Sequence, residues 1–198
     1  MTWAALDPVC VYCASAWGAR RAYRDAARAI GAALGERGIG LIYGGGKLGL
    51  MGEVADGAIA AGGRVIGVIT HDLKHKEVAH DGLTELQVVE TMHQRKRAMA
   101  DLARGFVALP GGVGTMDELF EILAWAQLGI HAKPVGILNV DGYYDPLLRF
   151  VAHMADEGFL RLRPDEAFLV GTDPGELLDR MRAWRPAPRR DWERTPRV

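Results

Sequence analysis

The feature of this sequence that most constrains its fold is a regular alternation between short apolar runs and longer amphipathic stretches. Six runs have strand length and a weaker seventh follows: Val9–Cys13, Ile39–Tyr43, Arg64–Ile69, Leu86–Glu90, Phe106–Leu109, Pro134–Val140 and Ala167–Val170. The stretches with helical periodicity are Ala19–Arg37, Leu48–Ala61, Met92–Arg104, Thr115–Leu128, Pro146–Glu157 and Pro174–Trp184. Such alternation is typical of a parallel sheet with helices on both faces. The sequence therefore predicts a doubly wound α/β fold.

The length of 198 residues is enough for one domain with a sizeable core. We expect a single domain over residues 1–184. The last stretch, RPAPRRDWERTPRV, is rich in arginine and proline and has no apolar periodicity. It is interpreted as a flexible basic tail over residues 185–198.

The composition gives no reason to expect nucleic acid or a membrane as a partner. Hydrophobic residues make up 49% of the chain, charged residues 25%, and the formal net charge is -1. The N-terminal stretch MTWAALDPVCVYC has no basic region ahead of a long apolar run, and no window approaches ~18 uninterrupted apolar residues. A cytoplasmic location is therefore expected.

Cys10 and Cys13 form a C-x-x-C pattern inside the apolar run VCVYC. Residues three apart on a strand point to opposite faces, so these thiols cannot easily meet. They are interpreted as buried core thiols and not as a redox pair.

The loop YGGGKLGLMG follows the second apolar run, and its Gly44, Gly46 and Gly49 satisfy the G-x-G-x-x-G pattern. This pattern raises the alternative of a nicotinamide-dependent oxidoreductase. The alternative is disfavoured because the next run, RVIGVIT, ends without the acid that would hold a ribose hydroxyl. Nor is the loop a P-loop, since Lys47 is followed by Leu48 instead of Ser or Thr.

Two further loops follow predicted strands. In CASAWG, Ser15 precedes a predicted helix and is interpreted first as its cap, with a ligand contact as the alternative. In THDLKHKEVAHDG, the spacing of His71, His75 and His80 fits no H-E-x-x-H site, and neighbouring lysines would repel a cation. We expect a solvated loop or lid there and no bound metal.

The stretch MHQRKRAMADLAR predicts a helix with an arginine in its apolar stripe. The stripe consists of Met92, Ala98, Met99, Leu102 and Ala103. Arg95 falls in its middle, whereas Arg97 lies on the far side as a solvated charge. Arg95 must extend its head to water, pair with an acid or bind an anion. We interpret Arg95 as functional, because it lies near a helix N-terminus at a strand end.

The stretch LPGGVGTMDE combines a glycine turn with two acids. Pro110 to Gly114 are predicted to form a tight turn and Thr115 to open a helix, so that consecutive N–H groups converge on a phosphate. Glu118 either closes a T-x-x-E capping box or serves the reaction. A carboxylate beside a phosphate suits an oxocarbenium-like transition state, as in a nucleotide that loses its base.

At this point the motif PGGVGTMDE resembles the P-G-G-x-G-T-x-x-E signature of the LOG family, the cytokinin riboside 5′-monophosphate phosphoribohydrolases. Further segments over residues 9–160 look like family segments in family order: CASAWG, GLIYGGGKLGLMGEVADGA, HKEVAHDGLTEL, ETMHQRK, WAQLGIHAKPVGILNVDGYYDPLL and DEGF. The resemblance implies a Rossmann-like fold. It also implies hydrolysis of the N-glycosidic bond of N6-substituted AMP, often AMP too, to free base and ribose 5-phosphate, with no metal or cofactor.

The resemblance also assigns site residues. Arg95 matches the family's catalytic arginine and Glu118 its catalytic glutamate. Expected substrate-binding residues are Ser15, Glu77, Lys96, Gly111, Gly112, Gly114 and Thr115. The stretch CASA departs from the C-G-S-S of many members at Ala14 and Ala16, which puts other contacts of that loop in doubt.

The segment WAQLGIHAKPVGILNVDGYYDPLL resembles the shorter, dimer-forming type of the family, so a homodimer with its active site near the interface is expected. Because related folds bind a phosphorylated pterin cofactor without breaking it, a non-catalytic carrier is the alternative. The older label of lysine decarboxylase is discounted, since the context of a pyridoxal phosphate lysine is missing.

Overall fold

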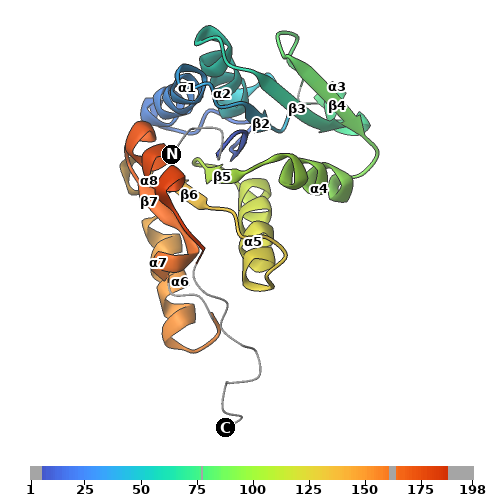
Figure 1. Cartoon of the computed structure of the whole chain (residues 1–198). Helices are drawn as coiled ribbons and strands as arrows, with labels where there is room; N and C mark the ends of the chain where they lie inside the picture. The colour runs from blue at the N-terminus through green and yellow to red at the C-terminus, as the bar shows by residue number, and fades with distance from the viewer. Residues whose placement is uncertain (1–5, 77, 161–163, 187–198) are drawn as a thin grey trace.

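A computed structural model describes residues 6–76, 78–160 and 164–186. All seven predicted strands are present in one parallel sheet: β1 Val9–Tyr12, β2 Leu41–Tyr43, β3 Val65–Thr70, β4 Glu85–Val89, β5 Gly105–Ala108, β6 Val135–Leu138 and β7 Leu169–Gly171. Their order is β4-β3-β2-β1-β5-β6-β7 (Figure 1). The chain extends the sheet from β1 in one direction, then returns beside β1 with β5. The order thus reverses between β1 and β5.

The six predicted long helices are confirmed, with ends shifted by a few residues. They are α1 Arg21–Glu36, α2 Gly49–Ala60, α4 Met92–Leu102, α5 Val113–Gln127, α6 Asp145–Asp156 and α8 Pro174–Ala183. Three shorter helices were not predicted: α3 His71–Lys76, η2 Val140–Gly142 and α7 Pro164–Ala167. No helix within the described ranges is long and apolar enough to cross a membrane. The predicted tail lies almost wholly in residues 187–198, outside the described ones.

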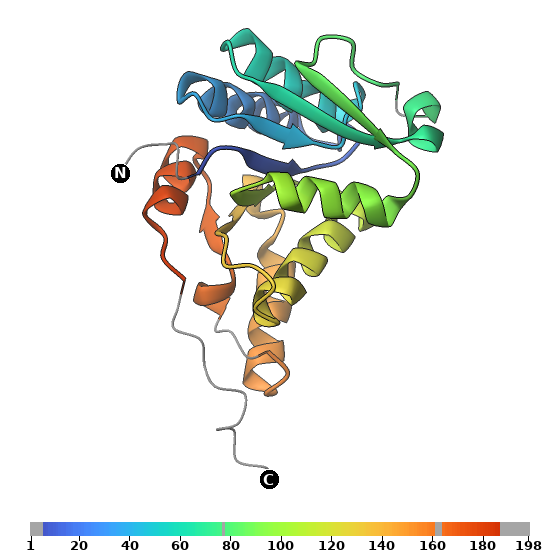
Figure 2. The same ribbon diagram turned by 45° about the vertical axis from the view of Figure 1, so that its right-hand side comes forward.

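The sheet is the middle layer of three (Figure 2). Helices α1, α2 and α8 cover one face, and α4 to α7 contribute to the core on the other. Alternate residues of β1 enter the two cores, as a strand buried on both faces requires. Cys10 belongs to one core and Cys13 to the other, both as free thiols. The prediction of two buried thiols on opposite faces is confirmed.

Helices α1 and α2 pack closely because glycine occupies their contact. A Cβ at Gly31 would collide with the carbonyl oxygen of Val54, so a larger residue would push the helices apart. Across the same contact, the buried Glu53 pairs with Arg24 at 2.7 Å and with Arg28 at 3.0 Å. The packing of α1 against α2 fixes the position of α2. The loop after β2 leads into α2, and the loop after β1 bonds to its first turn, so both loops are positioned with it.

The prediction of a solvated loop over THDLKHKEVAHDG was wrong in two respects. Residues His71–Lys76 form α3, and His80 is buried. Nε2 of His80 lies 3.1 Å from Oδ1 of Asp56 in α2, and its Nδ1 accepts a hydrogen bond from the Gly82 N–H. The backbone N–H of His80 also donates to the Gly45 carbonyl at 3.0 Å. The segment before β4 is therefore attached to the glycine loop after β2.

Candidate active site

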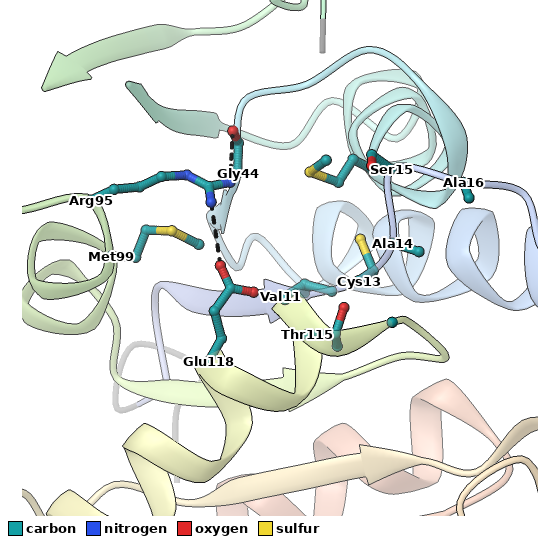
Figure 3. A pocket seen from close by; sticks show the side chains of 13 residues that line it. Val11, Cys13, Ala14, Ser15, Ala16, Gly44, Arg95, Met99, Thr115 and Glu118 are labelled. Carbon is teal, nitrogen blue, oxygen red and sulfur yellow. Dashed lines mark hydrogen bonds and ion pairs between the residues drawn. The ribbon is translucent and has the colours of Figure 1, made fainter. Parts of the chain in front are cut away.

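A cavity of about 250 Å³ lies where the strand order reverses, beyond the carboxyl ends of β1, β2 and β5 (Figure 3). Open α/β sheets bind ligands at this position. The lining residues are Val11, Cys13, Ala14, Ser15, Ala16, Gly44, Met51, Arg95, Met99, Gly112, Gly114, Thr115 and Glu118. Six of the nine expected site residues therefore line one cavity.

The N-terminus of α5 forms one wall of the cavity. Helix α5 begins at Val113 with Gly112 as N-cap, and no side chain caps it. Thr115 and Glu118 both lie inside the helix, so the predicted start at Thr115 and the T-x-x-E capping box were wrong. The first turn is closed by the Met116 N–H, which donates to the Gly112 carbonyl at 3.1 Å. The N–H groups of the residues before Met116 in this turn have no acceptor within the helix. Such free N–H groups make a helix start a binding site for anions.

The glycines before and within this turn have different roles. A Cβ at Gly111 would collide with the side chain of Thr115, so close packing requires glycine there. A Cβ at Gly112 or Gly114 would have no protein atom within 4 Å, and both residues line the cavity. The absence of their side chains leaves space beside the exposed backbone. Gly111 is not among the residues that line the cavity.

Arg95 is buried at the start of α4, opposite α5. Its Nε donates to the Val68 carbonyl at 2.9 Å and its Nη2 to the Gly44 carbonyl at 3.1 Å. A Cβ at Gly44 would collide with Nη2 of Arg95, so a larger residue there would displace the guanidinium from this position. A carbonyl within β3 and one just after β2 thus fix the guanidinium, and no sequence pattern indicated either acceptor.

Glu118 faces Arg95 across the cavity (Figure 3). Its Oε1 lies 3.5 Å from Nη1 of Arg95, and the side chains are 11% and 7% exposed. The separation is that of an ion pair and longer than a good charge-assisted hydrogen bond. The sequence left three options for Arg95: reaching water, pairing with an acid or binding an anion. The structure shows that it pairs with an acid.

The stripe predicted for α4 was only partly correct. Met99 is buried beside Arg95, but Met92 is 43% exposed. Arg97 is exposed as predicted, and its Nε donates to Asp101 at 2.7 Å. The helix starts with a capping box between Thr91 and Gln94, which was not predicted from the sequence.

Lys96 is buried on the same helix but does not line the cavity. Its Nζ lies 3.0 Å from Asp117 and 3.1 Å from Glu121 on α5. Burial lowers the pKa of Lys96, but hydrogen bonds and attraction from the two carboxylates outweigh it, so that the pKa is raised overall. Lys96 therefore joins α4 to α5 beside the cavity.

Ser15 lines the cavity and does not cap α1, whose N-cap is Arg20 without a side-chain cap. The predicted capping role was wrong, and the ligand contact remains. The loop around Ser15 has a second role, because the carbonyls of Ala14 and Ala16 accept hydrogen bonds from Met51 and Leu50 at 3.2 and 3.3 Å. These N–H groups belong to the first turn of α2, the helix that follows the G-x-G-x-x-G pattern. Because they already donate to protein carbonyls, they are not free to bind the pyrophosphate of a dinucleotide.

Glu77, an expected substrate-binding residue, lies outside the described residues. Among the residues that are described, no group of three or more His, Cys, Asp or Glu side chains is arranged to hold a metal ion. The apolar cavity residues Met51 and Met99 were not predicted as site residues, although Met99 was placed on the same stripe as Arg95.

Comparison with known proteins identifies the family. A family described as "Possible lysine decarboxylase" matches residues 51–181. The rice (Oryza sativa subsp. japonica) cytokinin riboside 5′-monophosphate phosphoribohydrolase LOG is 53% identical over 152 residues, which cover 77% of this chain and 63% of that protein. The Arabidopsis thaliana phosphoribohydrolase LOG5 is 46% identical over 178 residues, covering 90% and 78%. The chain belongs to the LOG family.

Solved structures of lower identity share the fold of this LOG-family chain. A molybdenum cofactor binding protein from Rippkaea orientalis superposes with a TM-score of 0.68 at 20% identity, covering 89% of this chain and 96% of that one. The molybdenum cofactor carrier protein of Chlamydomonas reinhardtii gives 0.67 at 22% identity, covering 90% and 99%. At such identities the likeness extends to the fold alone. The Rossmann-like α/β fold expected of the LOG family is thereby confirmed.

Proposed function

We propose that this LOG-family chain is an enzyme that hydrolyses the N-glycosidic bond of N6-substituted adenosine 5′-monophosphates, and of AMP, to free base and ribose 5-phosphate. The observation that carries the proposal is the buried Arg95–Glu118 pair facing the open helix start of α5 across one cavity. The names of the LOG relatives support the same reaction.

The phosphate is assigned to the backbone of Gly112 to Thr115. A helix N-terminus carries about half a positive charge and directs its free N–H groups outward. Gly112 and Gly114 leave the space for a phosphate to approach this backbone. The side chains of Thr115 and Ser15 line the same cavity and can add hydroxyl donors. Lys96 and Glu77 stay expectations from the family pattern.

The ribose then lies next to Glu118, one helical turn from Gly114. As the bond between C1′ and N9 breaks, positive charge develops on the sugar, and the Glu118 carboxylate stabilises it. The same carboxylate positions the attacking water, whose oxygen forms the new bond to C1′. The Glu118 carboxylate accepts a proton from this water. The electron pair of the broken bond leaves with the base, which takes up a proton.

Arg95 assists the departing base and orients Glu118. Its guanidinium is already held by the Val68 and Gly44 carbonyls, so little reorganisation is needed during the reaction. The apolar residues Val11, Met51 and Met99 line the cavity beside it and suit the aromatic base. No metal or organic cofactor is assigned a role.

The test is to incubate the purified protein with AMP and with isopentenyl-AMP and to follow free base and ribose 5-phosphate chromatographically. Release of base from both by the wild type, and none by Glu118→Gln, is the expected result. Tight nucleotide binding without base release would instead identify a carrier and reject the enzyme. The ratio of kcat/KM for the two nucleotides then ranks them, since a few apolar contacts contribute about 1–3 kcal/mol.

A cytoplasmic homodimer is part of the proposal. Large apolar side chains are exposed just after α5, where Leu128 and Ile130 are 57% and 56% exposed. Phe150 on α6 and Phe159 just after it are 55% and 83% exposed. Large exposed apolar side chains that lie together mark protein interfaces, and we propose that these four contribute to one. Light scattering should give twice the 21.6 kDa chain mass, and Phe150→Glu should shift the population to monomer. An unchanged monomeric mass in the wild type would reject the dimer.

A further inference from the structure

Two adjacent tyrosines reach from the η2 turn to the backbone of the glycine loop. The hydroxyl of Tyr143 donates to the Gly111 carbonyl and that of Tyr144 to the Leu109 carbonyl, both at 2.5 Å. The two acceptors flank Pro110, at the start of the loop that leads into α5. The proposed reaction assigns no role to either tyrosine.

The bond to Gly111 determines the direction of the next N–H group. In a trans peptide the carbonyl and the following N–H point in opposite directions. Since the Gly111 carbonyl points to Tyr143, the Gly112 N–H points away from Tyr143. Gly112 lines the cavity and Gly111 does not, which agrees with an N–H directed to the cavity side. A peptide between two glycines rotates easily, so an external bond is needed to hold this orientation.

The tyrosines are themselves held firmly. The Asn139 side chain accepts a hydrogen bond from the Tyr144 N–H at 2.8 Å and donates to Asp145 at 2.7 Å. The Tyr143 ring packs edge-on against Tyr23 at 5.6 Å and against Tyr144 at 5.0 Å. Burial raises the pKa of Tyr144, which keeps its hydroxyl protonated as a donor. Tyr143 is 38% exposed, so its hydrogen bond to Gly111 lies nearer to the surface than that of Tyr144.

We infer that Tyr143 is a positioning residue that aims the Gly112 N–H at a phosphate, so that its hydroxyl sets the preference for a 5′-monophosphate over the unphosphorylated nucleoside. Tyr144 holds the Leu109 carbonyl, two residues earlier, and so fixes the start of the loop. The inference rests on the proposed function for the identity of the anion. The contact acts through the backbone of the loop, and neither tyrosine lines the cavity.

The variant Tyr143→Phe removes the hydroxyl and keeps the ring contacts. Its control is Tyr23→Phe, which removes a hydroxyl from the neighbouring ring, for which the described residues provide no hydrogen bond to the loop. Calorimetry with ribose 5-phosphate should give roughly 5- to 10-fold weaker binding for Tyr143→Phe, the effect of one lost hydrogen bond. Tyr23→Phe should bind like the wild type. Equal melting temperatures would show that both variants are folded.

The second readout is turnover. For Tyr143→Phe, KM for AMP should rise with little change in kcat, while kcat/KM for adenosine should not change. An unchanged affinity for ribose 5-phosphate, or an equal loss for AMP and adenosine, would overturn the inference. If the wild type binds ribose 5-phosphate but releases no base from any nucleotide, the proposed reaction fails. A weaker affinity of Tyr143→Phe in that same assay would still support its positioning role.

Discussion

Arg95 of α4 and Glu118 of α5 form a buried ion pair, with 3.5 Å between Nη1 and Oε1. Arg95 has further partners in the Val68 and Gly44 carbonyls, so its position does not depend on Glu118. Removing one member of a buried pair leaves the other charge uncompensated. The loss of stability should therefore be smaller when Glu118 is replaced than when Arg95 is replaced.

Replacement of Glu118 by glutamine should separate catalysis from binding. The variant keeps the shape of the side chain and removes the charge that we propose stabilises the sugar cation, so kcat for AMP should fall by at least ~10²-fold. The affinity for ribose 5-phosphate should not fall. The matched control is Glu121→Gln, one turn further along α5, which should retain kcat within a few-fold. Comparable activity of Glu118→Gln and wild type would remove Glu118 from the mechanism.

Replacement of Arg95 by lysine should abolish turnover and weaken the fold. One ammonium group cannot reach the Val68 and Gly44 carbonyls and Glu118 together. Unsatisfied buried carbonyls cost about 1–3 kcal/mol, measurable by urea unfolding. The control Arg97→Lys affects an exposed pair with Asp101 and should change stability by less than ~1 kcal/mol. Equal stability losses in the two variants would contradict the proposed anchoring of Arg95.

Alanine at Gly111, before α5, and at Gly114, in its first turn, should have opposite effects on stability. Gly114→Ala adds a Cβ that meets no protein atom, and it should stabilise the helix by up to ~1 kcal/mol while weakening ribose 5-phosphate binding. Gly111→Ala should lower the melting temperature, because its Cβ collides with Thr115. Undiminished binding in Gly114→Ala would exclude this helix start as the phosphate site.

The link between α4 and α5 through Lys96 should depend on pH. The pKa of Lys96 is raised above its usual 10.5, so its stabilising contribution is present below that value and is lost as pH rises through the folded-state pKa. The stability difference between wild type and Lys96→Met should therefore shrink between about pH 8 and about pH 11. Urea unfolding at both values measures it. A difference independent of pH would contradict this prediction.

Much of the architecture could be predicted, because buried parallel strands and amphipathic helices leave strong periodic signals. The start of α5 could not, since Gly112 caps it without a side chain and a T-x-x-E pattern suggested a later start. The burial of His80 depends on Asp56 from another helix. The sequence singled out Arg95 by its place among apolar residues, but its backbone acceptors belong to β3 and to the loop after β2, both distant in the sequence.

The carbonyls of Ala14 and Ala16 bear on inhibitor design. They occupy the N–H groups at the start of α2, so of the helices that begin beside the crevice after β2 and β5, only α5 has its start open to a ligand. A compound with a second phosphate would compete with the protein's own backbone at α2 and gain no new helix-terminal contact there. Affinity should instead be sought at the base end, where Met51 and Met99 offer apolar surface.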